Sequence, residues 1–134
     1  MANTTFTGPV RSENGFEDVT KNATTGAFTT SATYDATIIG GVQSLSGAGA
    51  VDLTNLITEL TTTGANALTL ADGTTSGQVK IVNMIVDGGD GTLTPVTFAN
   101  GTTITFDAVA ESATLVWNST IGWVATSVQG ATIA

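Results

Sequence analysis

Short apolar runs, separated at close intervals by turn residues, fill the chain from Gly77 to Thr126. Runs rich in Val, Ile, Thr and aromatic residues and bounded by Gly, Asp, Asn and Pro are typical of β-strands joined by tight turns. The longest run, Gln78–Val86, is apolar at both alternating sets of positions, which indicates that both faces of this strand are at least partly buried. This part of the chain therefore predicts a compact antiparallel β-module without helices.

The same periodicity predicts short strands in the rest of the chain. The expected strands span residues 33–39, 67–70, 78–86, 93–98, 102–107, 113–117 and 121–128. Asn100-Gly101 is expected to close a hairpin between two of them, because Asn-Gly favours a type I′ turn. The segment SLSGAGA, residues 44–50, is expected to be a flexible loop. About eight strands and no helix predict an all-β fold, either a compact antiparallel β-sandwich or a barrel-like domain.

The segment VDLTNLITELTTT, residues 51–63, fits two kinds of structure. Its Val, Leu and Ile residues match helical spacing, and Asp52 could cap a helix. Its five Thr residues count against a helix, because a β-branched side chain loses rotamer freedom there. The alternation of Thr and Leu from Thr54 to Leu60 also fits a strand. We favour extended structure for this segment.

Residues 1–31 differ from the rest of the chain in their pattern. Charges are concentrated there, Gly8-Pro9 and Asn14-Gly15 are turn signals, and the apolar residues are too widely spaced to build a core. We expect an extended N-terminal arm followed by a β-domain over residues 32–134. A disordered tail or an ordinary edge strand is the alternative. Docking on another subunit is favoured because three Phe residues have little use in a solvated tail. The expected contact residues are Phe6, Val10, Arg11, Phe16 and Phe28.

The charge of the chain limits its partners. Only 10% of the 134 residues are charged, against about 25% in an average soluble domain, and Thr, Ala and Gly fill the space instead. The net charge is −8 with three basic residues, whereas phosphate binding needs clustered Lys and Arg. We therefore expect no nucleic-acid partner and no anionic membrane partner. The start of the chain lacks the pattern of a secretory signal, so we expect synthesis in the cytoplasm without general export.

The residues that usually perform catalysis are scarce. There is no Cys and no His, which excludes disulfides, Cys-ligated metals and the Ser-His-Asp or Cys-His kinds of nucleophilic catalysis. The carboxylates Asp87, Asp90, Asp107 and Glu111 lie in or beside turns, which recruit Asp for backbone reasons. We expect no enzymatic activity and no cofactor. Within Asp87–Gly91, the carboxylates Asp87 and Asp90 are weak calcium candidates, and a plain turn is the favoured interpretation.

Trp117 and Trp123 lie six residues apart on strands expected to be neighbours. An aromatic pair can form a platform for a sugar, but more often it closes a small core because each ring buries a large area. We favour the core, and an exposed binding face or a subunit interface is the alternative.

The order of motifs from Ala67 to Val128 resembles a known kind of domain. ALTLADGTTSGQVKIV is followed by DGGDGTLTP and then by NGTTITFDAVAESATLVWNSTIGWVATS. This order resembles a β-domain that recurs in virion proteins of tailed phages, including capsid decoration (cement) proteins and head or tail fibres. The N-terminal MANTTFTGPVRSENGF is similar to the starts of small structural proteins from marine phages, cyanophages among them.

The resemblance implies a function that the residue chemistry does not give. It implies a homotrimer on the outer surface of a phage head, where the protein would bind the major capsid protein and stabilise its lattice against DNA pressure. It carries over no active site. A receptor- or glycan-binding module of a fibre or tail is the alternative, motivated by the two Trp residues and the acidic Gly-rich loop. A single short domain without a stalk disfavours the fibre.

Overall fold

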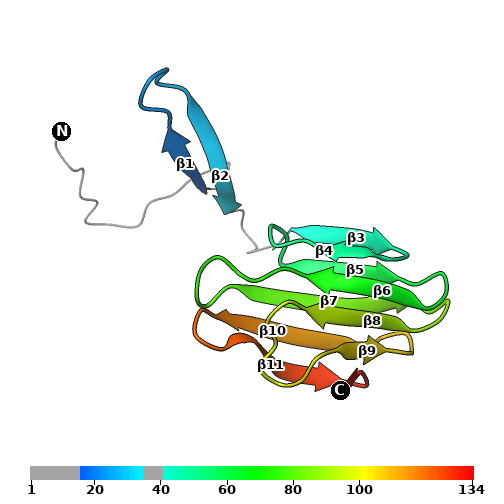
Figure 1. The fold of residues 1–134 in the computed structure, drawn as a ribbon. Helices are drawn as coiled ribbons and strands as arrows, with labels where there is room; N and C mark the ends of the chain where they lie inside the picture. The colour runs from blue at the N-terminus through cyan, green and yellow to red at the C-terminus, as the bar shows by residue number, and fades with distance from the viewer. Residues whose placement is uncertain (1–15, 35–40) are drawn as a thin grey trace, which may run out of the picture. The chain divides into compact units, whose positions relative to one another are not determined.

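The computed structural model describes residues 16–34 and 41–134, which belong to two compact units, Met1–Ile39 and Gly40–Ala134. In the first unit, β1 (Phe16–Lys21) and β2 (Phe28–Tyr34) form an antiparallel hairpin (Figure 1). The side chain of Asn22 shapes its turn, because Asn22 Oδ1 accepts hydrogen bonds from the backbone N–H groups of Thr24 and Thr25, both at 2.9 Å. The hairpin continues past residue 31, where the sequence placed the end of the arm, and the unit ends at Ile39.

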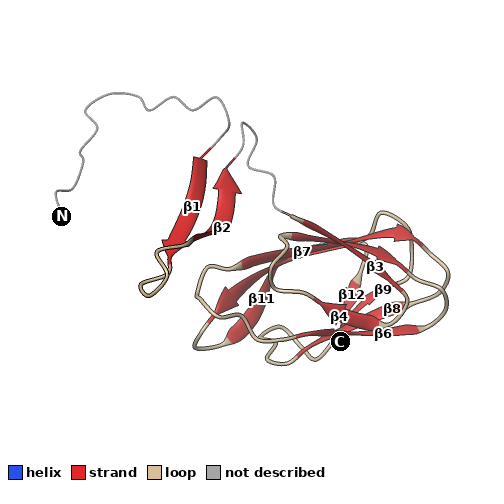
Figure 2. Cartoon of the chain, turned by 90° about the horizontal axis from the view of Figure 1, so that it is seen from above, coloured by secondary structure: helices blue, strands red, loops and turns tan. Residues whose placement is uncertain are grey.

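The second unit is a sandwich of two five-stranded sheets, which Figure 2 shows as separate layers. Its strands are β3 (Val42–Ser46), β4 (Gly49–Val51), β5 (Ile57–Thr61), β6 (Asn66–Leu70), β7 (Val79–Val86), β8 (Gly91–Pro95), β9 (Ile104–Phe106), β10 (Ser112–Asn118), β11 (Gly122–Gln129) and β12 (Thr132–Ile133). One sheet has the order β11-β10-β7-β5-β3, and the other has the order β12-β9-β8-β6-β4.

The first six strands of this unit wind between the two sheets. Each strand from β3 to β8 lies in the sheet opposite to the one before it, so the chain returns to each sheet in the same direction. As a result β3, β5 and β7 are parallel neighbours, and so are β4, β6 and β8. These strands form three turns of a flattened solenoid, and antiparallel strands β9 to β12 complete the two sheets.

The all-β sandwich is confirmed, and no helix is present in residues 16–34 or 41–134. The expected antiparallel pairing holds for the later strands, whereas the solenoid turns are parallel. A Gly-rich break looks the same in sequence whether the chain reverses within one sheet or crosses to the other. Consistent with the fold, the described residues contain no helix long and apolar enough to cross a membrane.

Local predictions had mixed outcomes. Extended structure is confirmed for the ambiguous segment, where Ile57–Thr61 is β5. The flexible loop at residues 44–50 is wrong, because this segment contains most of β3 and the start of β4. The tight hairpin at Asn100-Gly101 is also wrong. The antiparallel pair β8 and β9 is joined by residues 96–103 instead, and Asn100 Oδ1 accepts a hydrogen bond from the N–H of Ala125 at 2.8 Å.

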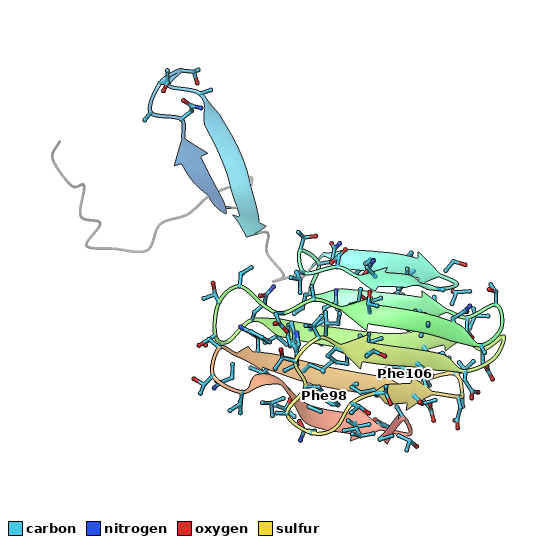
Figure 3. All side chains as sticks on the ribbon, in the orientation of Figure 1. Phe98 and Phe106 are labelled. Atoms are coloured by element: carbon cyan, nitrogen blue, oxygen red, sulfur yellow. The ribbon has the colours of Figure 1, made fainter. Side chains whose placement is uncertain are left out.

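The core lies between the two sheets and uses one side of every long strand. Buried and exposed positions alternate along β5, β6, β7 and β10, so every second side chain points inward. The buried apolar side chains are Val51, Leu60, Leu68, Leu70, Val82, Met84, Leu93, Ile104, Phe106, Ala113, Leu115, Trp117 and Trp123. Figure 3 labels Phe106 on β9, which is fully buried, and Phe98, which packs against this core.

Two glycines provide a matched test of the fold. Gly77 and Gly122 both have φ of 92°, but a Cβ at Gly77 would meet no atom within 4 Å, whereas one at Gly122 would lie 2.5 Å from the backbone oxygen of Thr97. We expect Gly77→Ala to lower the free energy of unfolding by about 1–2 kcal/mol through backbone strain alone. Gly122→Ala is expected to lower it by roughly 1–3 kcal/mol more, because the backbone must move. Urea denaturation measures both, and equal losses would contradict the close approach at Gly122.

Candidate functional surface

The outer face of the β11-β10-β7-β5-β3 sheet presents a continuous group of large aliphatic side chains. One row joins Val42, Ile57 and Ile81, which are register partners on β3, β5 and β7. The next row joins Val79, Val116 and Val124 on β7, β10 and β11. We call these six residues the aliphatic face. Their neighbours along the strands are mostly buried, so these side chains point outward.

The aliphatic face is exposed although it is apolar. Val42 is 46% exposed and Val79 is 36% exposed, and the other four are partly exposed. The strands of this sheet contain only two ionisable side chains, Glu59 and Lys80, and Lys80 points inward. Glu59 is therefore the one ionisable group on the outer face of these strands. Contiguous exposed apolar surface of this kind marks interaction sites on soluble proteins.

The outer face of the other sheet has different chemistry. Its outward positions are all Thr or Ala: Ala50, Thr69 and Thr94 in one row, and Ala67, Thr92, Thr105 and Thr132 in the next. A Thr hydroxyl can hydrogen-bond water while its methyl group suits the strand. The two outer faces are therefore both nearly free of charge, but only the first is strongly apolar.

The Asp87–Gly91 loop is arranged as a turn. Asp87 Oδ1 accepts a hydrogen bond from the N–H of Gly89 at 2.8 Å, and the N–H of Gly88 donates to Thr62 Oγ1 at 2.8 Å. Asp90 lines a shallow depression of about 220 Å³ with Asn66 and Thr92 and no second carboxylate. Within residues 16–34 and 41–134, no group of three or more Asp, Glu, His or Cys residues could hold a metal ion. The hydrogen bonds of this loop are those of a turn, which is the interpretation favoured from the sequence.

Asp107 and Glu111 are brought together in the loop between β9 and β10. Glu111 Oε2 accepts a hydrogen bond from the N–H of Asp107 at 2.7 Å. The charge of Glu111 raises the pKa of Asp107, with smaller contributions from a hydrogen bond to Glu111, from desolvation and from the charge of Asp87. The pair closes the loop between β9 and β10.

The core interpretation of the two Trp residues is confirmed. Trp123 is fully buried and Trp117 is 7% exposed, and their ring centroids lie 5.4 Å apart at an interplanar angle of 59°. Trp123 Nε1 donates a hydrogen bond to the carbonyl oxygen of Ala71 at 2.9 Å. Rings buried in this way offer no face to a sugar.

The burial of Lys80 was not predicted from the sequence. Lys80 points from β7 into the sandwich with 1% of its surface exposed. Its Nζ donates to the carbonyl oxygen of Asn55 at 2.8 Å and to Asp52 Oδ1 at 3.4 Å. Asp52 Oδ2 in turn accepts a hydrogen bond from Asn55 Nδ2 at 2.6 Å. This cluster fastens the loop between β4 and β5 to β7. The signal in sequence was one Lys at an inward position of an apolar strand.

The two charges of this cluster affect each other. Burial lowers the pKa of Lys80, and the nearby charge of Asp52 partly opposes that effect. For Asp52, burial alone would raise the pKa, but hydrogen bonds from Asn55 and the charge and hydrogen bond of Lys80 bring it below 3.8. The described residues leave no buried side-chain nitrogen or oxygen without a hydrogen-bond partner. Every buried polar atom of the cluster therefore has a hydrogen-bond partner, and the cluster stabilises the fold.

The five contact residues predicted for the arm lie partly outside the described residues and partly in the β1–β2 hairpin. Phe6, Val10 and Arg11 lie outside the described residues. Phe16 is the first residue of β1 and Phe28 is the first residue of β2. Phe16 pairs with Tyr34 and Phe28 pairs with Lys21 in the backbone register of the hairpin. Their role in docking stays a prediction.

Comparison with known proteins does not assign a family. No protein-family model matches the chain. A search of curated proteins finds no significant match either.

The Lys80 cluster predicts a pH-dependent effect of Asp52→Asn. The Asn side chain retains an oxygen for the turn but removes the negative charge beside Lys80, so we expect a loss of about 1–2 kcal/mol in the free energy of unfolding at pH 7. Because the folded-state pKa of Asp52 lies below 3.8, its stabilisation is present above pH 3.8 and is lost as the pH falls through the folded value. Urea denaturation across this range should show the difference between wild type and variant shrinking towards acid pH. A difference independent of pH would contradict this role of the carboxylate.

Proposed function

We propose that this chain is a structural protein of a tailed-phage virion, a capsid decoration (cement) protein that binds the outer surface of the head and stabilises the lattice of the major capsid protein. The observation that carries the proposal is the aliphatic face, a nearly uncharged apolar surface on a chain of net charge −8. Contiguous exposed apolar surface commonly marks the sites through which proteins associate. The motif order from Ala67 to Val128 supports the placement of that assembly in a virion.

The use of the polar groups in the described residues also favours assembly over chemistry. Asp52 and Lys80 are paired and hydrogen-bonded within the fold, and Glu111 closes a loop. A catalytic site instead keeps titratable groups facing a cavity that a substrate can enter. The proposal therefore gives the chain no enzymatic activity and no cofactor.

The fibre or receptor-binding function is weaker on this structure. Its main motivation was a sugar platform formed by Trp117 and Trp123, and both rings are buried in the core. The shallow depression beside Asp90 has no aromatic ring among its lining residues. Sugar sites commonly stack a ring against an aromatic side chain, so this depression is poorly suited.

Binding to phage heads tests the function and the arm in one experiment. Heads that lack the protein are mixed with purified full-length chain, and bound protein is measured after the heads are sedimented. We expect saturable binding by wild type. We also expect Phe6→Ala/Val10→Ala/Arg11→Ala to weaken binding by at least about 10-fold, because large side chains at the centre of an interface dominate its affinity.

A matched control is Asn3→Ala/Thr4→Ala/Thr5→Ala, which changes three polar residues of the same segment and should bind like wild type. Absence of wild-type binding would contradict the decoration function. Undiminished binding by the first variant would show that the arm is not the anchor, while leaving the function supported.

A further inference from the structure

We infer that the aliphatic face is the surface through which copies of this chain associate with one another. This inference rests on the proposed function, for which the motif resemblance implies an oligomer, and it names the part of the fold that forms the contact. The occupant of the face is a second copy of the chain.

The aliphatic face is the apolar part of the outer face of the β11-β10-β7-β5-β3 sheet, and the size of that whole outer face suits an interface between subunits. The sheet has five strands spaced about 4.8 Å apart, and its central strand β7 has eight residues rising about 3.3 Å each, which gives a projected area of roughly 500 Å². The accessible area of a surface covered by side chains exceeds its projection. The accessible area of this outer face therefore approaches the roughly 800 Å² that each partner buries in a standard specific interface.

The distribution of charge favours a second copy over a basic partner. The unit Gly40–Ala134 contains seven acidic residues and one basic residue, the buried Lys80. Six of the seven acidic residues lie outside the strands of this sheet, and Glu59 alone occupies an outward position in them. A basic partner would dock where the carboxylates are. Two copies with the same negative charge repel each other least where both surfaces lack charge, and the aliphatic face is such a surface.

The composition of the face also suits self-association. β-branched side chains have few rotamers, so ordering them between two subunits costs little conformational entropy. Together the two rows span all five strands of the sheet, so the apolar contact can extend across its whole width. The Thr and Ala face on the opposite sheet remains hydrated, which leaves one surface of the sandwich polar in the assembly.

The test compares two double variants with identical composition. Val42→Asp/Val79→Asp places two charges on the aliphatic face. Val96→Asp/Val109→Asp places the same two charges on valines that are 71% and 57% exposed and lie in loops outside both sheets. Sedimentation equilibrium of the purified proteins at tens of micromolar gives their masses in solution. Thermal unfolding, followed by the fluorescence of the buried Trp residues, confirms that each variant is folded.

We expect wild type and Val96→Asp/Val109→Asp to be oligomers of one size, and Val42→Asp/Val79→Asp to be a folded monomer. The dissociation constant of the latter should rise by at least ~100-fold, because two buried aliphatic contacts are replaced by charges. If it fails to fold, Val42→Thr/Val79→Thr keeps the β-branched shape and should still weaken the oligomer.

Three results would overturn the inference. They are a monomeric wild type, an oligomer of Val42→Asp/Val79→Asp as tight as wild type, and equal dissociation of both double variants. Because the masses are measured without heads, these outcomes are separate from the fate of the proposed function. A monomeric wild type whose head binding is lost in Val42→Asp/Val79→Asp would assign the face to the capsid protein and support decoration.

Discussion

The fold depends on one constraint, which is that each strand from β3 to β8 crosses to the opposite sheet before the next begins. Consecutive strands then never pair with each other, and each pairs with the strand one turn away in parallel register. Inward side chains such as Leu60, Leu68 and Met84 meet between the layers, so the two sheets stabilise each other by burying apolar surface. The crossings also fix the outer faces, since a one-residue slip would exchange inward and outward side chains.

A buried cation completes this arrangement at one crossing. The loop between β4 and β5 supplies both acceptors of Lys80, the carbonyl oxygen of Asn55 and the carboxylate of Asp52. A buried ammonium without partners would cost several kcal/mol, so the loop and β7 hold each other in place. The same loop precedes β5, whose outward Ile57 belongs to the aliphatic face. The polar cluster inside the sandwich thus helps to position the apolar surface outside it.

The sequence predicted the strand content better than the topology. The continuous apolar run Gln78–Val86 and the alternation in residues 113–117 identified β7 and β10 nearly to their ends. Burial of one face produces alternation, and burial of both faces produces a short apolar run. Residues 44–50 gave no such signal, since Ser, Gly and Ala dominate there and parallel pairing with β5 and β6 makes the strands. Asn100-Gly101 suggested a tight hairpin. In the structure the side chain of Asn100 instead accepts a hydrogen bond from the backbone N–H of Ala125.

The aliphatic face illustrates the same limit. Its six residues are spread over five strands, and only the register brings Val42 beside Ile57 and Val79 beside Val116. In sequence, outward Val79 and Ile81 indicated burial of both faces of one strand, which is consistent with a covering partner. The buried Trp pair, in contrast, was correctly favoured as core because two large rings on neighbouring strands rarely stay exposed.

Cryo-EM of the parent virion, at a resolution that traces individual strands, would show directly where this chain lies and which face it uses for contact. We expect density for this sandwich on the outer surface of the head, with copies in contact through the β11-β10-β7-β5-β3 sheets and the Thr and Ala faces open to solvent. Density confined to the tail, or copies on the head whose aliphatic faces are exposed to solvent, would contradict this expectation.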